Sequence, residues 1–116
     1  MPFQMNEKQV LIQSLLAAKT KSYTAEFELL LMGKADEANQ VMQAGKPLSK
    51  KIDSLIAQTM QDWIGDANKL NKKVQLSNAK IQRSISEIRR DVNTANNVVK
   101  LVGYIDDVVG IVGSLV

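Results

Sequence analysis

The chain has 116 residues, the size of one ordinary domain, and 45% of them are apolar, which is too many for a disordered tail. It contains no Cys and no His, which excludes disulfide frameworks, thiolate or imidazole metal sites, Ser-His triads and the HExxH zinc motif. Its 15 basic and 12 acidic residues give a net charge of only +3, and we expect a protein without enzymatic activity, cofactor or small-molecule substrate.

The composition predicts an all-α protein, because Ala, Leu, Lys, Gln, Glu and Met are abundant and no segment alternates like a strand. A first helix is predicted over about residues 6–44. Gly45-Lys46-Pro47 is the strongest turn signal, since Gly suits the end of one helix and Pro the start of the next. An alternative is a turn at Gly33-Lys34-Ala35-Asp36, which would give Asp36–Ala44 a short helix of its own.

A second, long helix is predicted over about residues 48–102. From Ile52 onward the apolar residues recur at steps of three, four or seven, which is the spacing of one helix face. Such a face predicts a coiled-coil-like seam in a long antiparallel helical hairpin, with Trp63 as a core anchor. The predicted seam consists of Trp63, Leu70, Val74, Ile81, Ile85, Ile88, Val92 and Val102.

The last predicted element is an amphipathic helix over about residues 104–115, joined to the long helix near Gly103. Its apolar face adds Ile105, Val109 and Val112 to the predicted interaction surface. The first helix is too short to cover the apolar stripe from Ile88 to Val102. We therefore expect a homo-oligomer, with a dimer favoured, that completes a four-helix bundle; another helical protein is the alternative partner.

The tripeptide Trp63-Ile64-Gly65 resembles the Trp-x-Gly motif of small secreted helical-hairpin proteins of the ESX type. In that family the motif lies in the hairpin turn, near the middle of a chain of about this length. The resemblance covers three residues. The family's C-terminal Tyr-x-x-x-Asp/Glu signal is missing, because Val108 stands four residues after Tyr104.

Positive charge is concentrated in residues 46–90, which carry ten basic and four acidic groups. On the long helix six of these basic residues, which we call the basic ridge, fall opposite the seam, and clustered cations attract phosphates. The simpler interpretation of this charge cluster is a solvated outer helix face, because no aromatic residue lies among the basic residues to stack bases. The candidate anion contacts are Lys69, Lys72, Lys73, Lys80, Arg83 and Arg90.

These features favour a non-enzymatic helical protein for protein–protein interaction or assembly, as a scaffold, adaptor or chaperone-like component. One alternative is a membrane-active or leaderless secreted protein that uses residues 98–116. Another is a nucleic-acid-binding hairpin that uses the basic ridge. The first residues lack the pattern of a signal peptide, and no stretch reaches the ~18 apolar residues of a membrane span. We expect a cytoplasmic protein, with secretion without a cleavable signal as the alternative.

Overall fold

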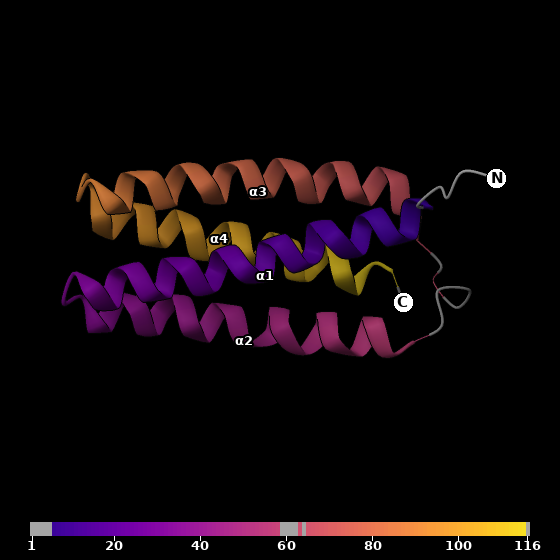
Figure 1. Cartoon of the computed structure of the whole chain (residues 1–116), viewed down its shortest axis with the longest axis horizontal. Coiled ribbons are helices and arrows are strands. Elements are labelled where there is room, and N and C mark those ends of the chain that lie inside the picture. Colours follow the sequence, from indigo (N-terminus) through magenta and orange to yellow (C-terminus); the bar gives the residue numbers. More distant parts are fainter. Residues whose placement is uncertain (1–5, 59–62, 64, 116) are drawn as a thin grey trace.

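The computed structural model describes residues 6–58, 63 and 65–115, and the elements in this part of the chain are four α-helices (Figure 1). Helix α1 spans Glu7–Leu31, α2 spans Ala35–Ala57, α3 spans Ala67–Arg89 and α4 spans Thr94–Gly113. The expected all-α fold class is confirmed. Several of the expected helix boundaries are wrong, and the errors have physical reasons.

Two of the four helices begin at side-chain caps that the sequence supplies. At α1 the Asn6 side chain accepts a hydrogen bond from the Gln9 backbone N–H at 2.9 Å, and the Gln9 side chain accepts one from the Asn6 N–H at 3.2 Å. This reciprocal pair is a capping box. At α3 the Asp66 carboxylate accepts from the Lys69 N–H at 3.1 Å. Both caps satisfy backbone donors that have no partner within the helix.

The first turn lies at Gly33, which was the alternative position, and not at Gly45-Lys46-Pro47. Gly33 has a φ of +74°, a conformation that costs other residues free energy but not glycine. The Lys34 N–H donates to the Leu29 carbonyl at 2.9 Å, and the Gly33 N–H donates to the Leu30 carbonyl at 3.1 Å. These bonds form the glycine-dependent C-terminal motif that ends many helices. The expected single helix over residues 6–44 is therefore two helices.

The predicted turn residues Gly45 and Pro47 lie inside α2. Gly45 is buried where α2 approaches α1 closely, since a Cβ atom there would lie only 3.2 Å from Ser22 Oγ. Pro47 cannot donate to the carbonyl of Gln43, but both residues are exposed, so water can satisfy that carbonyl. The glycine is therefore explained by packing, and the proline is tolerated because it lies on the solvent side.

The predicted long helix over residues 48–102 is interrupted twice. The first interruption separates Ala57, the end of α2, from Ala67, the start of α3; residues 59–62 and 64 of this connection are outside the described part. Trp63 lies in the connection and is buried with 6% exposure. A Cβ atom on Gly65 would lie 2.9 Å from Leu70 Cδ1 and 3.0 Å from the Ser114 carbonyl oxygen. Gly65 thus packs tightly against the ends of α3 and α4, and a larger residue at position 65 would require its neighbours to shift.

The second interruption is a turn between α3 and α4, where neither Gly nor Pro is present. Asp91 and Asn93 adopt positive φ angles of 53° and 47°, which Asp and Asn tolerate better than most residues. The buried Asn97 side chain donates to the Val92 carbonyl at 2.8 Å and to Glu87 Oε2 at 2.9 Å. The last helix therefore starts at Thr94 and not near residue 104, and the expected joint at Gly103 is an interior position of α4.

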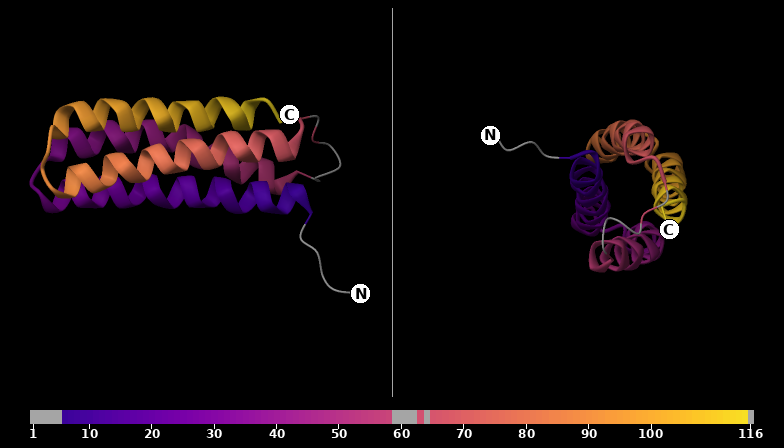
Figure 2. Two further views of the ribbon diagram at one scale, coloured as in Figure 1. Left: turned by 90° about the horizontal axis from the view of Figure 1, so that it is seen from above. Right: turned by 90° about the vertical axis from the view of Figure 1, so that its right-hand side faces the viewer.

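The four helices form one bundle measuring 49 × 25 × 19 Å, in which α1 and α4 lie at opposite corners (Figure 2). α1 packs beside α2 and α3, and α4 also packs beside α2 and α3. Side-chain pairs between α1 and α3 follow the same order on both helices, from Ser14–Asn71 through Lys21–Gln82 to Glu28–Arg89, so these helices are parallel. α1 and α2 are antiparallel, because Lys19 meets Asp53 while Tyr23 meets Ser49.

This arrangement removes the argument from which the dimer was expected. The stripe from Ile88 to Val102 is not part of one projecting helix, because α3 ends at Arg89 and α4 folds back along it. Ile88, Val98 and Leu101 are fully buried within the single chain. The four-helix bundle is completed by the chain's own C-terminal helix, so no second copy is needed to cover this stripe.

Candidate functional site

Most side chains of the predicted interaction surface lie in the core of the bundle. Trp63, Leu70, Val74, Ile81, Ile85, Ile88, Ile105 and Val112 are all buried. Val102 and Val109 are half-buried against the core. Val92 differs, since it lies in the α3–α4 turn and is 45% exposed. These residues pack the helices of one chain against each other, so they are not free to form a surface for a partner.

The predicted basic ridge is exposed but spread over the length of α3 and the turn that follows it. The exposed cations are Lys69, Lys72, Lys73, Lys80, Arg83 and Arg90. Lys80 and Arg83 line a pocket of about 110 Å³ between α3 and α4, together with Lys100 of α4. Lys100 was missed because it stands alone in an acidic stretch of sequence, and the α3–α4 turn brings it to the ridge.

The Lys80–Arg83–Lys100 pocket has one carboxylate, and that group already has a partner. Glu87 lines the pocket and accepts the hydrogen bond from Asn97. The Lys80 Nζ lies 5.7 Å from the centre of the Tyr104 ring, an arrangement that stabilises a cation. Three cations around one engaged carboxylate make the pocket electropositive, and its volume suits a group about as large as a phosphate.

The most unusual surface is on α1, whose outward side carries almost no charge. Among the exposed residues of α1, Glu7 is the only charged one. The others form what we call the α1 outer face: Gln13, Leu16, Thr20, Tyr23, Phe27, Leu30 and Leu31. Its apolar members are 39% to 67% exposed, with Phe27 at 61% and Leu31 at 67%. The exposed side of α2 carries Lys and Asp instead, and that of α3 carries Lys and Arg.

Two heptad-like stripes run along α1, and only one of them is covered. The inner stripe, with alternating steps of four and three, faces the core and consists of Leu11, Leu15, Ala18, Ser22, Ala25 and Leu29. The outer stripe has the same spacing and consists of Gln13, Leu16, Thr20, Tyr23, Phe27 and Leu30. Steps of this kind are typical of a surface that packs against another helix. α1 therefore has one stripe packed inside the bundle and a second stripe exposed on its surface.

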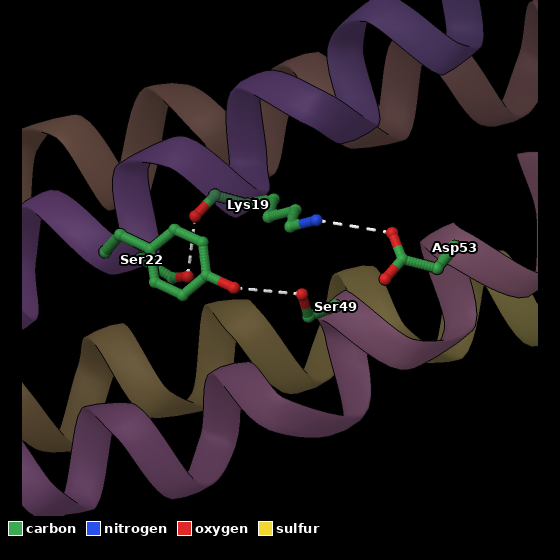
Figure 3. Close-up of polar contacts among 5 residues, drawn as sticks. Lys19, Ser22, Ser49 and Asp53 are labelled. Carbon is green, nitrogen blue, oxygen red and sulfur yellow. Dashed lines mark hydrogen bonds and ion pairs between the residues drawn. The ribbon is translucent and has the colours of Figure 1, made fainter.

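The charged side chains of α1 lie on the flanks of the outer face and several of them bind neighbouring helices. Lys19 Nζ pairs with Asp53 Oδ1 of α2 at 3.3 Å, beside the hydrogen bond from Ser22 to the Lys19 carbonyl (Figure 3). On the other flank Glu28 pairs with Arg89 of α3 at 3.0 Å. Tyr23 is anchored at the edge by a 2.9 Å hydrogen bond between its hydroxyl and Ser49 Oγ. The charges thus stabilise the bundle while leaving the outer face neutral.

The described residues offer neither a membrane-spanning helix nor a metal site. No helix there is long and apolar enough to cross a bilayer. No group of three or more carboxylates in that part of the chain is arranged to hold a metal ion. No protein family, curated protein or solved structure is detectably similar to this chain. The chain's own surfaces are therefore the guide to its function.

Proposed function

We propose that the protein acts without catalysis, as a helical assembly module that binds a partner helix through the α1 outer face. The observation that carries this proposal is the uncharged part of the α1 outer face, with five exposed apolar side chains from Leu16 to Leu31. Monomeric soluble proteins rarely expose large contiguous apolar patches, and those that do commonly use them for binding. The heptad-like spacing favours a helix as the bound element.

The proposal can be tested by photo-crosslinking in the cells that make the protein. A photoreactive phenylalanine analogue placed at Phe27 should form a discrete protein adduct on irradiation, because that side chain would lie inside the interface. The same analogue at Leu76 is the matched control, since Leu76 is 60% exposed on α3 and Phe27 is 61% exposed on α1. We expect no discrete adduct from position 76.

Two results would count against this function. If position 27 gave no discrete adduct, the outer face would have no stable protein partner. If positions 27 and 76 gave the same adducts, the contacts would be non-specific collisions. A Leu31→Glu change in the chain that carries the analogue at position 27 should abolish a genuine adduct, because it places a charge in the α1 outer face without touching the core.

A second candidate function is the binding of a phosphate-bearing anion in the Lys80–Arg83–Lys100 pocket. It is supported by the three cations that line the pocket and by the engagement of its single carboxylate by Asn97. This candidate restricts the expected nucleic-acid contact of the basic ridge to a phosphate group bound in this pocket. The pocket volume is large enough for a phosphate group, and the sequence segment that carries Lys69, Lys72 and Lys73 contains no aromatic residue to stack a base.

A titration of the purified chain with a short single-stranded oligonucleotide at low salt tests this candidate. Arg83→Gln should weaken binding markedly and reduce its salt dependence, because one phosphate contact and its released counterion are lost. Lys69→Gln, on the same helix but outside the pocket, should have a smaller effect. Equal effects of the two changes would indicate diffuse attraction to α3, and absence of binding at low salt would dismiss the candidate.

The membrane alternative is less well supported. The apolar side chains of residues 98–116 that it requires include Val98, Leu101, Ile105, Val108, Val112 and Leu115, and all of these are buried in the bundle. Lipid binding through these side chains would require α4 to separate from α2 and α3, which would expose the buried faces of both of those helices. The α1 outer face needs no such opening.

A further inference from the structure

We propose that the partner of the α1 outer face is a second copy of this chain, bound through antiparallel packing of α1 against α1. This inference rests on the proposed function and names its partner. It differs from the dimer expected from the sequence, which relied on the stripe from Ile88 to Val102. That stripe is covered within one chain, whereas the α1 outer face is not.

The outer face is suited to self-association because it is neutral and its apolar residues are distributed over most of its length. A two-fold interface places the same patch on both subunits, so a patch with net charge would repel itself. The antiparallel register that keeps heptad layers aligned places Leu16 opposite Phe27 of the partner subunit. It also places Thr20 opposite Tyr23 of the partner subunit, so the two-fold axis passes close to Tyr23.

The flanking charges favour the same register. Lys19 and Glu26 are seven residues apart on the flank of the outer face nearest α2, and both are half-buried. In antiparallel packing like flanks meet, so Lys19 would approach Glu26 of the partner subunit, and the reciprocal pair would form by symmetry. Glu26 has no cationic partner among the described residues, whereas Lys19 binds Asp53. In a parallel arrangement unlike flanks meet, so Lys19 would not approach Glu26 of the partner subunit and this pair could not form.

The size of the patch agrees with a weak dimer. From their exposed fractions, the five apolar residues present on the order of 500 Å² per copy, within the range of the largest apolar patches on monomers. Two copies would then bury about 1,000 Å² in total, which is near the lower limit for specific interfaces. The association should therefore depend on protein concentration and should be reversible.

Sedimentation equilibrium of the full chain, from low micromolar to near-millimolar concentration, tests for the dimer. The mass should rise from 12.8 kDa toward twice that value. Phe27→Glu should weaken dimerisation about tenfold or more, because it buries a charge within the interface, opposite Leu16 of the partner subunit. Leu76→Glu, an equally exposed site on α3, should leave dimerisation unchanged. A mass of one chain throughout, or equal effects of the two changes, would overturn the inference.

Cross-linking distinguishes the antiparallel arrangement from others, because the chain has no Cys and one introduced thiol is unique. In the proposed register the two Tyr23 positions lie about 5 Å apart along the helix axis and the two Gln13 positions about 25 Å apart. A short bismaleimide should join Tyr23→Cys chains and not Gln13→Cys chains. If both were joined, the helices would be parallel; if neither were joined, the interface would lie elsewhere. Either result would overturn the inference.

The in-cell adduct from position 27 separates this inference from the proposed function. An adduct at twice the chain mass supports both. An adduct at another mass supports the helix-binding function but shows that the partner is not a second copy of this chain. Absence of any adduct removes the function itself.

Discussion

Replacing Trp63 with alanine should lower the free energy of unfolding by about 3–5 kcal/mol, the usual cost of truncating a large buried aromatic side chain. Trp63 is 6% exposed and belongs to the hydrophobic core although it lies in the α2–α3 connection. Chemical denaturation followed by circular dichroism measures the change. The chain has a single Trp, so its fluorescence in the native protein should report a buried indole.

Two control variants define what Trp63 contributes. Lys72→Ala removes an exposed side chain and should change the stability by no more than about 0.5 kcal/mol. Trp63→Phe keeps an aromatic ring and should cost much less than Trp63→Ala, because the indole N–H has no hydrogen-bond partner among the described residues. If Trp63→Ala cost no more than Lys72→Ala, the connection would not be packed on the core.

Replacing Pro47 with alanine should raise the free energy of unfolding by about 2 kcal/mol. Proline is about 3 kcal/mol less favourable than alanine inside a helix, and its stiffening of the unfolded chain offsets at most about 1 kcal/mol of that difference. The site lies within α2 and is exposed, so no core contact is lost. Thermal and chemical denaturation of the two proteins measure the gain.

A glycine at position 47 provides the matched control. Pro47→Gly also restores the backbone donor, but glycine is about 1 kcal/mol worse than alanine within a helix. The gain should therefore be smaller than for Pro47→Ala. A loss of stability with Pro47→Ala would show that the chain needs a break there, as the sequence pattern of Gly45-Lys46-Pro47 had indicated.

The sequence predicted which residues form helices better than where the helices end. The apolar periodicity identifies the buried faces of α3 and α4 correctly, since residues such as Val74, Ile85 and Ile105 are in the core. The periodicity carries no information about the α3–α4 turn, because Asp91 and Asn93 form it without Gly or Pro. Conversely, Gly45 and Pro47 were read as a turn because the close approach of α1 to α2, which explains Gly45, is a tertiary effect.

The α1 outer face could have been predicted from the sequence but was not. Both stripes of α1 have heptad-like spacing, and a helix that is apolar on two sides can be recognised from such spacing alone. What the sequence could not supply is which stripe faces the core. That choice depends on α2 and α3, which cover the side bearing Leu15 and Leu29 and leave Phe27 exposed. The Lys80–Arg83–Lys100 pocket likewise exists only because the chain reverses between α3 and α4.

The placement of α2 and α3 on opposite corners of the bundle has a consequence for how the chain folds. Each tight turn joins two helices that pack directly together, so either pair can form after closing a loop of only a few residues. Contacts between the pairs, such as Lys21 with Gln82, join residues 61 positions apart. Long-range contacts of this kind form late and slow the overall rate. We therefore expect docking of the α1–α2 pair with the α3–α4 pair to limit the rate of folding.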